Sequence, residues 1–224
     1  MHFDSRRIRY LKLTVAAYAL WIVCFELVGQ LSSLLPSRDL STPLDRAIPL
    51  FPPAIWLYES CYLLPFAVPL FAKDFRRVHV GFAAAIIANA TAFIVYLAYP
   101  VAFPRPELGN SLAERLLALE YALDFQPGAN NLPSLHVAMS FLTLLTCARQ
   151  GLSRGLVCTL TLLVLGITAS TLLVKQHLVL DVALGVLWAF ASFKLAERWS
   201  QRREVRTAEV TPPSGASEYV RARE

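Results

Sequence analysis

Long apolar blocks dominate this sequence, and they restrict its fold more than any other feature. A helix needs about 20 apolar residues to cross a hydrocarbon layer. Six stretches are long enough, or nearly so, at about 11–35, 53–72, 78–99, 133–148, 155–174 and 178–196. The chain is 56% hydrophobic and 17% charged, whereas soluble domains are about 45–50% apolar and about a quarter charged. We therefore expect an all-α polytopic membrane protein, with a six-helix bundle over residues 1–200.

The two ends of the chain are expected to differ in structure. The first block follows basic residues, but it is too long for the apolar region of a signal peptide and ends in no A-x-A cleavage pattern, so a retained signal-anchor helix is expected. The polar segment 201–224 contains Pro212 and Pro213 and is expected to be a disordered cytoplasmic tail.

The distribution of basic residues predicts the orientation. If the basic N-terminus is cytoplasmic and the chain crosses six times, the cytoplasmic segments carry 16 of the 21 Lys and Arg residues. The external segments keep Arg38, Arg46, Arg105, Arg115 and Lys175. The positive-inside rule then predicts that both termini are cytoplasmic. The net charge of +5 is explained by this topology, and basic residues scattered over four segments give no support for nucleic-acid binding.

The same topology brings three polar segments to the external side. They are Tyr99–Pro106, Asn130–His136 and Lys175–Asp181. Each segment is weak evidence of a site by itself, but their convergence on one membrane surface indicates a functional site there. No Cys/His zinc spacing and no Gly-rich nucleotide loop is found, so no metal or cofactor is expected.

His177 and Asp181 have the spacing of two side chains on one face of a helix. The carboxylate could accept a hydrogen bond from one imidazole nitrogen and leave the other nitrogen free as a nucleophile. An aspartate one turn inside a membrane helix is costly without a partner. The alternative is a histidine that only satisfies this aspartate, and the spacing alone does not separate the two interpretations.

The sequence Pro133-Ser134-Leu135-His136 is typical of a helix start. Proline is favoured at the first helical position, and free N–H groups at such a terminus bind anions. Ser134 could add a hydroxyl donor, and His136 could protonate a leaving alkoxide as a general acid. The alternative is an ordinary serine cap followed by an interfacial histidine.

Two cations lie in the external segments near these motifs. Arg105 stands between two prolines, and a planar guanidinium suits bidentate phosphate binding. Its alternative role is to anchor the loop to lipid headgroups. Lys175 has the same two possible roles, because its ammonium could pair with phosphate or extend to the headgroup level.

The order Arg-Pro, then Pro-Ser-x-His, then His-x-x-x-Asp resembles the type 2 phosphatidic acid phosphatase (PAP2) superfamily, from about the third apolar block to the sixth. The resemblance implies that His177 is a nucleophile that forms a phosphohistidine and that Asp181 orients it. It further implies that His136 protonates the leaving group, and that Arg105 and Ser134 bind phosphate oxygens without a metal.

The sequence departs from that family's pattern at two cations. Ala98 stands where the first motif has a lysine, and Thr171 stands where the third motif has an arginine. Lys175 follows Thr171 by four residues, so on a continuing helix it would face the same side and partly replace the missing charge. The altered third motif, together with Leu135 in place of a glycine, resembles the branch that contains inositol phosphorylceramide synthases, in which a phospho-headgroup can pass to an alcohol.

Two further features bear on the site. Residues 110–125 carry leucines at helical spacing, with Ser111 and Glu114 at capping-box spacing, and predict a short amphipathic helix on the outer surface. Glu26 and Glu59 are carboxylates within apolar blocks, with Tyr58 and Tyr62 near the second. They could line a headgroup pocket, or form structural hydrogen bonds between helices.

The sequence thus predicts an integral plasma (inner) membrane phosphatase or phosphotransferase that acts on a lipid phosphate, with its site facing the periplasm or exterior. One alternative keeps the fold and transfers a phospho-headgroup to an alcohol. The other is a lipid-binding or transport protein without catalysis, which the two absent cations motivate. The lipid substrate and the oligomeric state are not fixed by the sequence.

Overall fold

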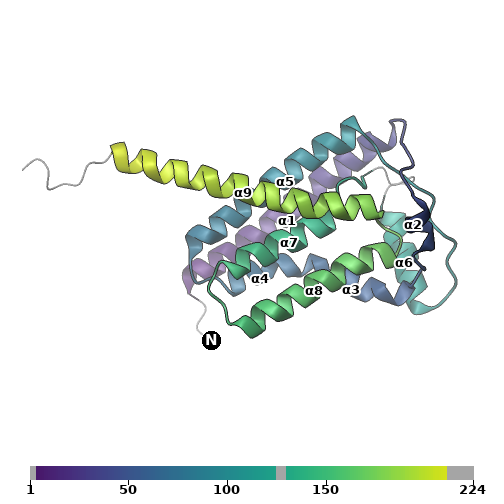
Figure 1. Cartoon of the computed structure of the whole chain (residues 1–224), viewed down its shortest axis with the longest axis horizontal. Coiled ribbons are helices and arrows are strands. Elements are labelled where there is room, and N and C mark those ends of the chain that lie inside the picture. The colour runs from purple at the N-terminus through teal and green to yellow at the C-terminus, as the bar shows by residue number, and fades with distance from the viewer. Residues whose placement is uncertain (1–3, 125–129, 211–224) are drawn as a thin grey trace, which may run out of the picture.

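A computed structural model describes residues 4–124 and 130–210, and this part of the chain is helical (Figure 1). Four helices are long and apolar enough to span a membrane: α1 (Ser5–Ser33), α5 (Phe75–Ala98), α8 (Arg154–Leu173) and α9 (Val179–Val210). The apolar helix α7 (Leu135–Ala148) is shorter. Within the described ranges the only β-pairing is two isolated bridges that join loops. The all-α expectation is confirmed, whereas only four of the six predicted spans form helices of spanning length.

The second predicted span is not one helix, and that part of the prediction is wrong. Residues 52–70 form a chain of short helical pieces: η1 (Pro52–Ala54), α3 (Ile55–Glu59), η2 (Ser60–Tyr62), η3 (Leu64–Phe66) and α4 (Ala67–Leu70). Prolines explain the breaks, because each lacks an N–H donor and its ring clashes with the preceding turn. They stand at positions 52, 53, 65 and 69.

Small residues bring the central helices close together. On α5, Ala84, Ala88 and Ala92 recur every fourth residue and are fully buried. They belong to one cluster with Ala138 of α7 and Ala189 of α9. Small side chains let helix backbones approach closely in membrane bundles. The resulting α5–α7–α9 core holds the first residues of α7 and of α9 in fixed positions.

Two short helices cover one end of this bundle. Helix α2 (Pro43–Ala47) and helix α6 (Leu112–Leu123) lie beside α3 at the right of Figure 1. Helix α6 confirms the amphipathic helix predicted at 110–125, and Ser111 and Glu114 form its capping box. Leu117 and Tyr121 are the buried residues of α6.

The opposite end of the bundle carries the basic residues. Arg7 donates to the carbonyl oxygen of Ala72 at 3.0 Å, and the Lys73 ammonium donates to that of Gly151 at 2.8 Å. Helix α9 runs past the core here to Val210, as Figure 1 shows. Residues 201–210 are therefore helical, contrary to the predicted start of a disordered tail, because the helix simply continues into polar sequence. Residues 211–224 lie outside the described part of the chain.

Candidate active site

The three polar segments predicted to converge do meet at the end covered by α2, α3 and α6. The Asn131 side chain donates to the carbonyl oxygen of Val101 at 2.8 Å. Arg105 donates to Gln176 at 2.8 Å, and the Ser134 backbone N–H donates to the carbonyl oxygen of Asp181 at 3.0 Å. Each segment thus bonds to another, although they lie far apart in the sequence.

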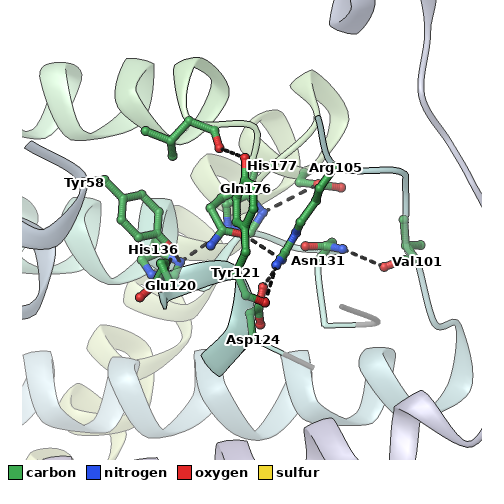
Figure 2. Close-up of polar contacts among 12 residues, drawn as sticks. Tyr58, Val101, Arg105, Glu120, Tyr121, Asp124, Asn131, His136, Gln176 and His177 are labelled. Carbon is green, nitrogen blue, oxygen red and sulfur yellow. Dashed lines mark hydrogen bonds and ion pairs between the residues drawn. The ribbon is translucent and has the colours of Figure 1, made fainter. Parts of the chain in front are cut away.

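Two histidines contact each other at the centre of this end. His136 is the second residue of α7, and His177 stands two residues before α9 begins. Nε2 of His177 lies 3.3 Å from Nδ1 of His136 (Figure 2). His177 is buried and His136 is partly buried. The pair brings together the two residues predicted to be nucleophile and general acid.

The backbone around His177 is fixed by the end of α8. The N–H groups of Gln176 and His177 both donate to the carbonyl oxygen of Thr171, at 3.0 and 3.2 Å. The side chain of Thr171 is fully buried and donates to the carbonyl oxygen of Thr168. The backbone carbonyl of Thr171, the position where the resemblance leads us to expect an arginine, therefore fixes the turn that presents His177.

Asp181 lies beside Nδ1 of His177, on the side of the ring opposite His136. It is fully buried, and its Oδ2 accepts a hydrogen bond from the backbone N–H of Leu178 at 2.8 Å. The same oxygen lies 3.6 Å from Nδ1 of His177, an ion-pair separation that is longer than a hydrogen bond. His177 precedes α9, so the two residues do not share one continuous helix as predicted. They still face each other because Asp181 is in the first turn.

Ser134 is the N-cap of α7. Its hydroxyl oxygen accepts a hydrogen bond from the backbone N–H of Val137, and its side chain is fully buried. The helix begins at Leu135, so Pro133 precedes the cap. The expectation that Pro133 is the first helical residue is therefore wrong. A serine in this place satisfies one of the free N–H groups of the helix. Its role as a phosphate ligand stays a prediction.

Arg105 is held by three partners close to the histidine pair. Its guanidinium forms an ion pair with Asp124 and donates to the carbonyl oxygen of Tyr121 at 3.0 Å and to Oε1 of Gln176. It also lies over the Tyr121 ring, 4.5 Å from the centroid. Figure 2 shows it between Gln176 and Asp124. Gln176, which precedes His177 in the sequence, is thus one of the residues that hold the Arg105 side chain in place.

Lys175 is placed differently from its prediction. Helix α8 ends at Leu173, and Lys175 has a φ of 54° in the turn that follows. Its ammonium donates to the backbone carbonyl oxygens of Asp45 and Ile48 at 2.8 and 2.5 Å. The expected continuation of the helix through Lys175 is therefore wrong, because the chain turns sharply before it reaches α9. Replacement of the missing arginine by this residue stays a prediction.

Asp45 lies in the external loop before the second apolar block and joins α2 to the start of α9, a role that sequence reasoning did not predict. Its Oδ1 accepts a hydrogen bond from the N–H of Val179 at 2.7 Å, and its Oδ2 accepts from the N–H and hydroxyl of Thr42. Burial tends to raise the pKa of Asp45, but the hydrogen bonds from Thr42 and Val179 outweigh it and leave the pKa lowered. Asp45 thus remains charged at the N-terminus of the helix that carries Asp181.

A second set of side chains was mentioned in the sequence analysis but not assigned to the histidines. The hydroxyl of Tyr62 lies 3.0 Å from Nε2 of His136, and that of Tyr58 lies 3.5 Å from Nδ1. Both hydroxyls donate to Oε1 of Glu120 at 3.3 Å. Two tyrosines four residues apart could have indicated a common helical face. The direction of that face could not be predicted, because the second span is broken into short helical pieces.

The donor set of the site is suited to proton and phosphoryl chemistry. A neutral His177 with its proton on Nδ1, toward Asp181, has a free electron pair on Nε2. The Arg105 guanidinium donates to the side chain of Gln176, the residue that precedes His177. In the described ranges, no group of three or more His, Cys, Asp and Glu side chains is arranged to hold a metal ion.

Comparison with known proteins found a family match. A family model described as the PAP2 superfamily matches residues 40–195, which is more than half of the chain and includes every site residue named above. No match was found among curated proteins or among solved structures.

Proposed function

The chain belongs to the PAP2 superfamily, and on this premise we propose that it is an integral-membrane enzyme that cleaves a lipid phosphate ester through a phosphohistidine at His177. The observation that carries the proposal is the contact of 3.3 Å between His177 and His136, with Asp181 behind the first ring. This arrangement brings together a candidate nucleophile, a candidate acid and a candidate orienting carboxylate, the three groups that a two-step phosphoryl transfer uses.

In the first step, Nε2 of His177 attacks phosphorus and the ester P–O bond breaks. The leaving oxygen takes a proton from His136. The phosphorylated ring carries a positive charge, because Nδ1 keeps its proton, and the buried Asp181 carboxylate stabilises that charge. In the second step, an acceptor O–H attacks phosphorus, its proton passes to His136, and the P–N bond breaks.

The substrate must separate the two histidines. Two nitrogens 3.3 Å apart leave no room for a phosphoryl group between them. Binding therefore turns at least one ring away from the other. His177 is fixed through its backbone by Thr171, whereas His136 lies against the tyrosine rings of the short helical pieces, with its ring centroid 4.5 Å from that of Tyr58. We assign the movement to a turn of the His136 ring that carries Nδ1 away from His177 while Nε2 stays beside Tyr62.

Arg105 and Ser134 are the proposed ligands of the phosphate oxygens. The Arg105 guanidinium contacts the acidic side chain of Asp124 and the neutral side chain of Gln176. An incoming phosphate therefore competes with the Asp124 carboxylate for N–H donors of the guanidinium. The hydroxyl hydrogen of Ser134 is available for donation, because in the cap its oxygen acts as acceptor. A contribution of Lys175 to phosphate binding would require its ammonium to leave the carbonyls of Asp45 and Ile48, so Lys175 is not proposed as a main ligand.

The proposed placement has six crossings, both termini in the cytoplasm and the site at the extracytoplasmic face of the plasma membrane. Helix α7 and the broken segment 52–70 would complete the four long spans. The basic side chains at the end opposite the site support this orientation. Large apolar side chains exposed on α1, α8 and α9 are consistent with contact with lipid. Examples are Leu20, Leu162 and Leu187.

Transfer to an alcohol instead of water is the second candidate. The observation that favours it is Thr171, which replaces an arginine of the usual phosphate site and serves the backbone of His177. A site with fewer cations holds a free phosphate product less tightly. Radiolabelled lipid incubated with and without an alcohol acceptor separates the two, because only a hydrolase releases phosphate to water alone.

The purified full-length chain should release phosphate from a panel of lipid phosphates in detergent with EDTA present. His177→Asn should abolish the release, and the matched variant His79→Asn, at the opposite end of α5, should keep it. Equal phosphate release by the His177→Asn variant and the unaltered chain would contradict the phosphohistidine. No release from any lipid phosphate by the unaltered chain would contradict the enzyme and leave a lipid-binding protein on the same scaffold.

A further inference from the structure

Behind His136 lies a layer of groups that the proposed two-step reaction does not use. The Tyr62 hydroxyl lies 3.0 Å from Nε2 of His136, on the side of the ring away from Nδ1, which contacts His177. The Tyr62 oxygen also lies 3.3 Å from Oε1 of Glu120. Because the hydroxyl has one proton, Tyr62 donates to Nε2 of His136 when a protonated Glu120 donates to the Tyr62 oxygen. These contacts make one continuous chain from the nucleophile to helix α6, which covers this end of the bundle. Figure 2 shows His177, His136 and Glu120 of this chain.

Glu120 is the end of this chain, and several groups face it. The hydroxyls of Tyr58 and Tyr62 lie 3.3 Å from its Oε1, and the charges of Glu59, Asp124 and Arg105 act on it. The carboxyl groups around Glu120 favour its protonated form, within reach of Tyr62.

The charge environment acts in the same direction. Burial raises the pKa of Glu120, and the Asp124 carboxylate raises it further, against the opposing effects of the tyrosine hydroxyls and Arg105. A protonated Glu120 is a donor as well as an acceptor.

His136 needs a second proton path if it is to act as a general acid from Nδ1. A neutral imidazole with its only proton on Nδ1 would become an anion if it gave that proton away. The anion is avoided when Nε2 receives a proton as Nδ1 loses one. The Tyr62 hydroxyl is within hydrogen-bond reach of Nε2 and could deliver that proton.

We propose that Glu120 and Tyr62 form a proton relay that reloads His136 through its Nε2 atom, an inference that rests on the proposed function. As the ester bond breaks, Nδ1 gives its proton to the leaving oxygen. The Tyr62 hydroxyl proton moves to Nε2, the Glu120 carboxyl proton moves to Tyr62, and Glu120 is left as a carboxylate. Attack by the acceptor reverses each transfer, so the relay is restored after one turnover. Neither residue touches the substrate, and both are positioning residues for the proton of His136.

The test compares two substrates that differ in their need for an acid. An alkyl phosphate lipid leaves as an alkoxide that must be protonated, whereas a nitrophenyl phosphate ester leaves as a stable phenolate. Tyr62→Phe and Glu120→Gln should each lower kcat for the alkyl substrate by about tenfold or more. They should lower kcat much less for the nitrophenyl substrate. Tyr99→Phe and Glu107→Gln are the matched controls at the same end of the bundle, and they should change neither rate.

The outcomes are distinguishable. Equal losses on both substrates would mean that the two residues only support the fold of the site, and unchanged rates on both would mean that they do nothing for His136; either result overturns the relay and leaves the proposed function standing. A nitrophenyl ester that the unaltered chain does not cleave, together with no release from any lipid phosphate, overturns the function and the relay with it. If Tyr62→Phe fails to fold, the substrate comparison for Glu120→Gln decides.

Discussion

Nε2 of His177 lies 3.3 Å from Nδ1 of His136, and the two rings come from positions 41 residues apart in the chain. One ring is held through its backbone by the end of α8, and the other is part of the first turn of α7. The contact joins the second and third polar segments of the sequence at one point. It makes the pair a unit whose two members can be tested separately.

The first prediction concerns the carboxylate behind His177. Asp181→Asn should lower kcat by about a hundredfold or more, because the neutral amide no longer stabilises the positive charge that the ring acquires when Nε2 bonds to phosphorus. The amide oxygen can still accept from the N–H of Leu178, so the melting temperature should change little. Asp39→Asn, in an exposed loop at the same end, is the control. Normal turnover by Asp181→Asn would refute the orienting role.

The second prediction concerns the guanidinium fork. Arg105→Lys should raise KM and lower kcat/KM by about tenfold or more, because an ammonium cannot keep contact with Gln176 and Asp124 while it binds a phosphate along one edge. Arg115→Lys, on the exposed face of α6, should leave both parameters unchanged. Similar kinetics for the two variants would mean that Arg105 anchors the loop and does not contact the substrate.

The third prediction separates two roles of Lys175. In the structure its ammonium satisfies the carbonyls of Asp45 and Ile48, so Lys175→Gln should lower the free energy of unfolding by about 1–2 kcal/mol. Activity measured well below the melting temperature should be largely kept. Thermal unfolding and steady-state kinetics of the same preparation give both quantities. A large loss of activity at an unchanged melting temperature would instead support the role of Lys175 as a replacement for the missing arginine.

The fourth prediction concerns the close approach of α9 to the cap of α7. A Cβ atom at Gly185 would lie 2.6 Å from the carbonyl oxygen of Ser134, whereas one at Gly155 would meet nothing within 4 Å. Gly185→Ala should therefore destabilise the protein by about 1–3 kcal/mol through overpacking and displace the first turn of α7. Gly155→Ala should be neutral or slightly stabilising, because alanine favours a helix. Thermal unfolding of the two variants tests the difference, and equal melting temperatures would contradict the close contact.

Much of the bundle could be predicted because long apolar blocks leave few alternatives in a membrane. Helices α1, α5, α8 and α9 fall within or around their predicted ranges. The capping box of α6 was also predictable, because Ser111 and Glu114 carry it locally. The second span was harder, since its mean hydropathy fits a helix while its prolines remove the backbone donors that a helix needs.

The site was predictable where its residues are reactive and hidden where they act through the backbone. His136, His177 and Asp181 could be singled out because each is costly or unusual inside a membrane segment. Asp45 could not, because its partner is an N–H group of α9 that only the folded chain brings near. Lys175 was misplaced for a related reason: its ammonium donates to the carbonyl oxygens of Asp45 and Ile48, which only the folded chain brings near.

The measurement that tests the central claim most directly is capture of the phosphoenzyme. The full-length protein is mixed with a ³²P-labelled lipid phosphate, quenched rapidly in alkaline detergent and digested, and the labelled peptide is sequenced. The account predicts a base-stable, acid-labile label on His177, absent from His177→Asn and retained in His79→Asn. Turnover without any such label, or a label on another residue that persists in His177→Asn, would contradict it.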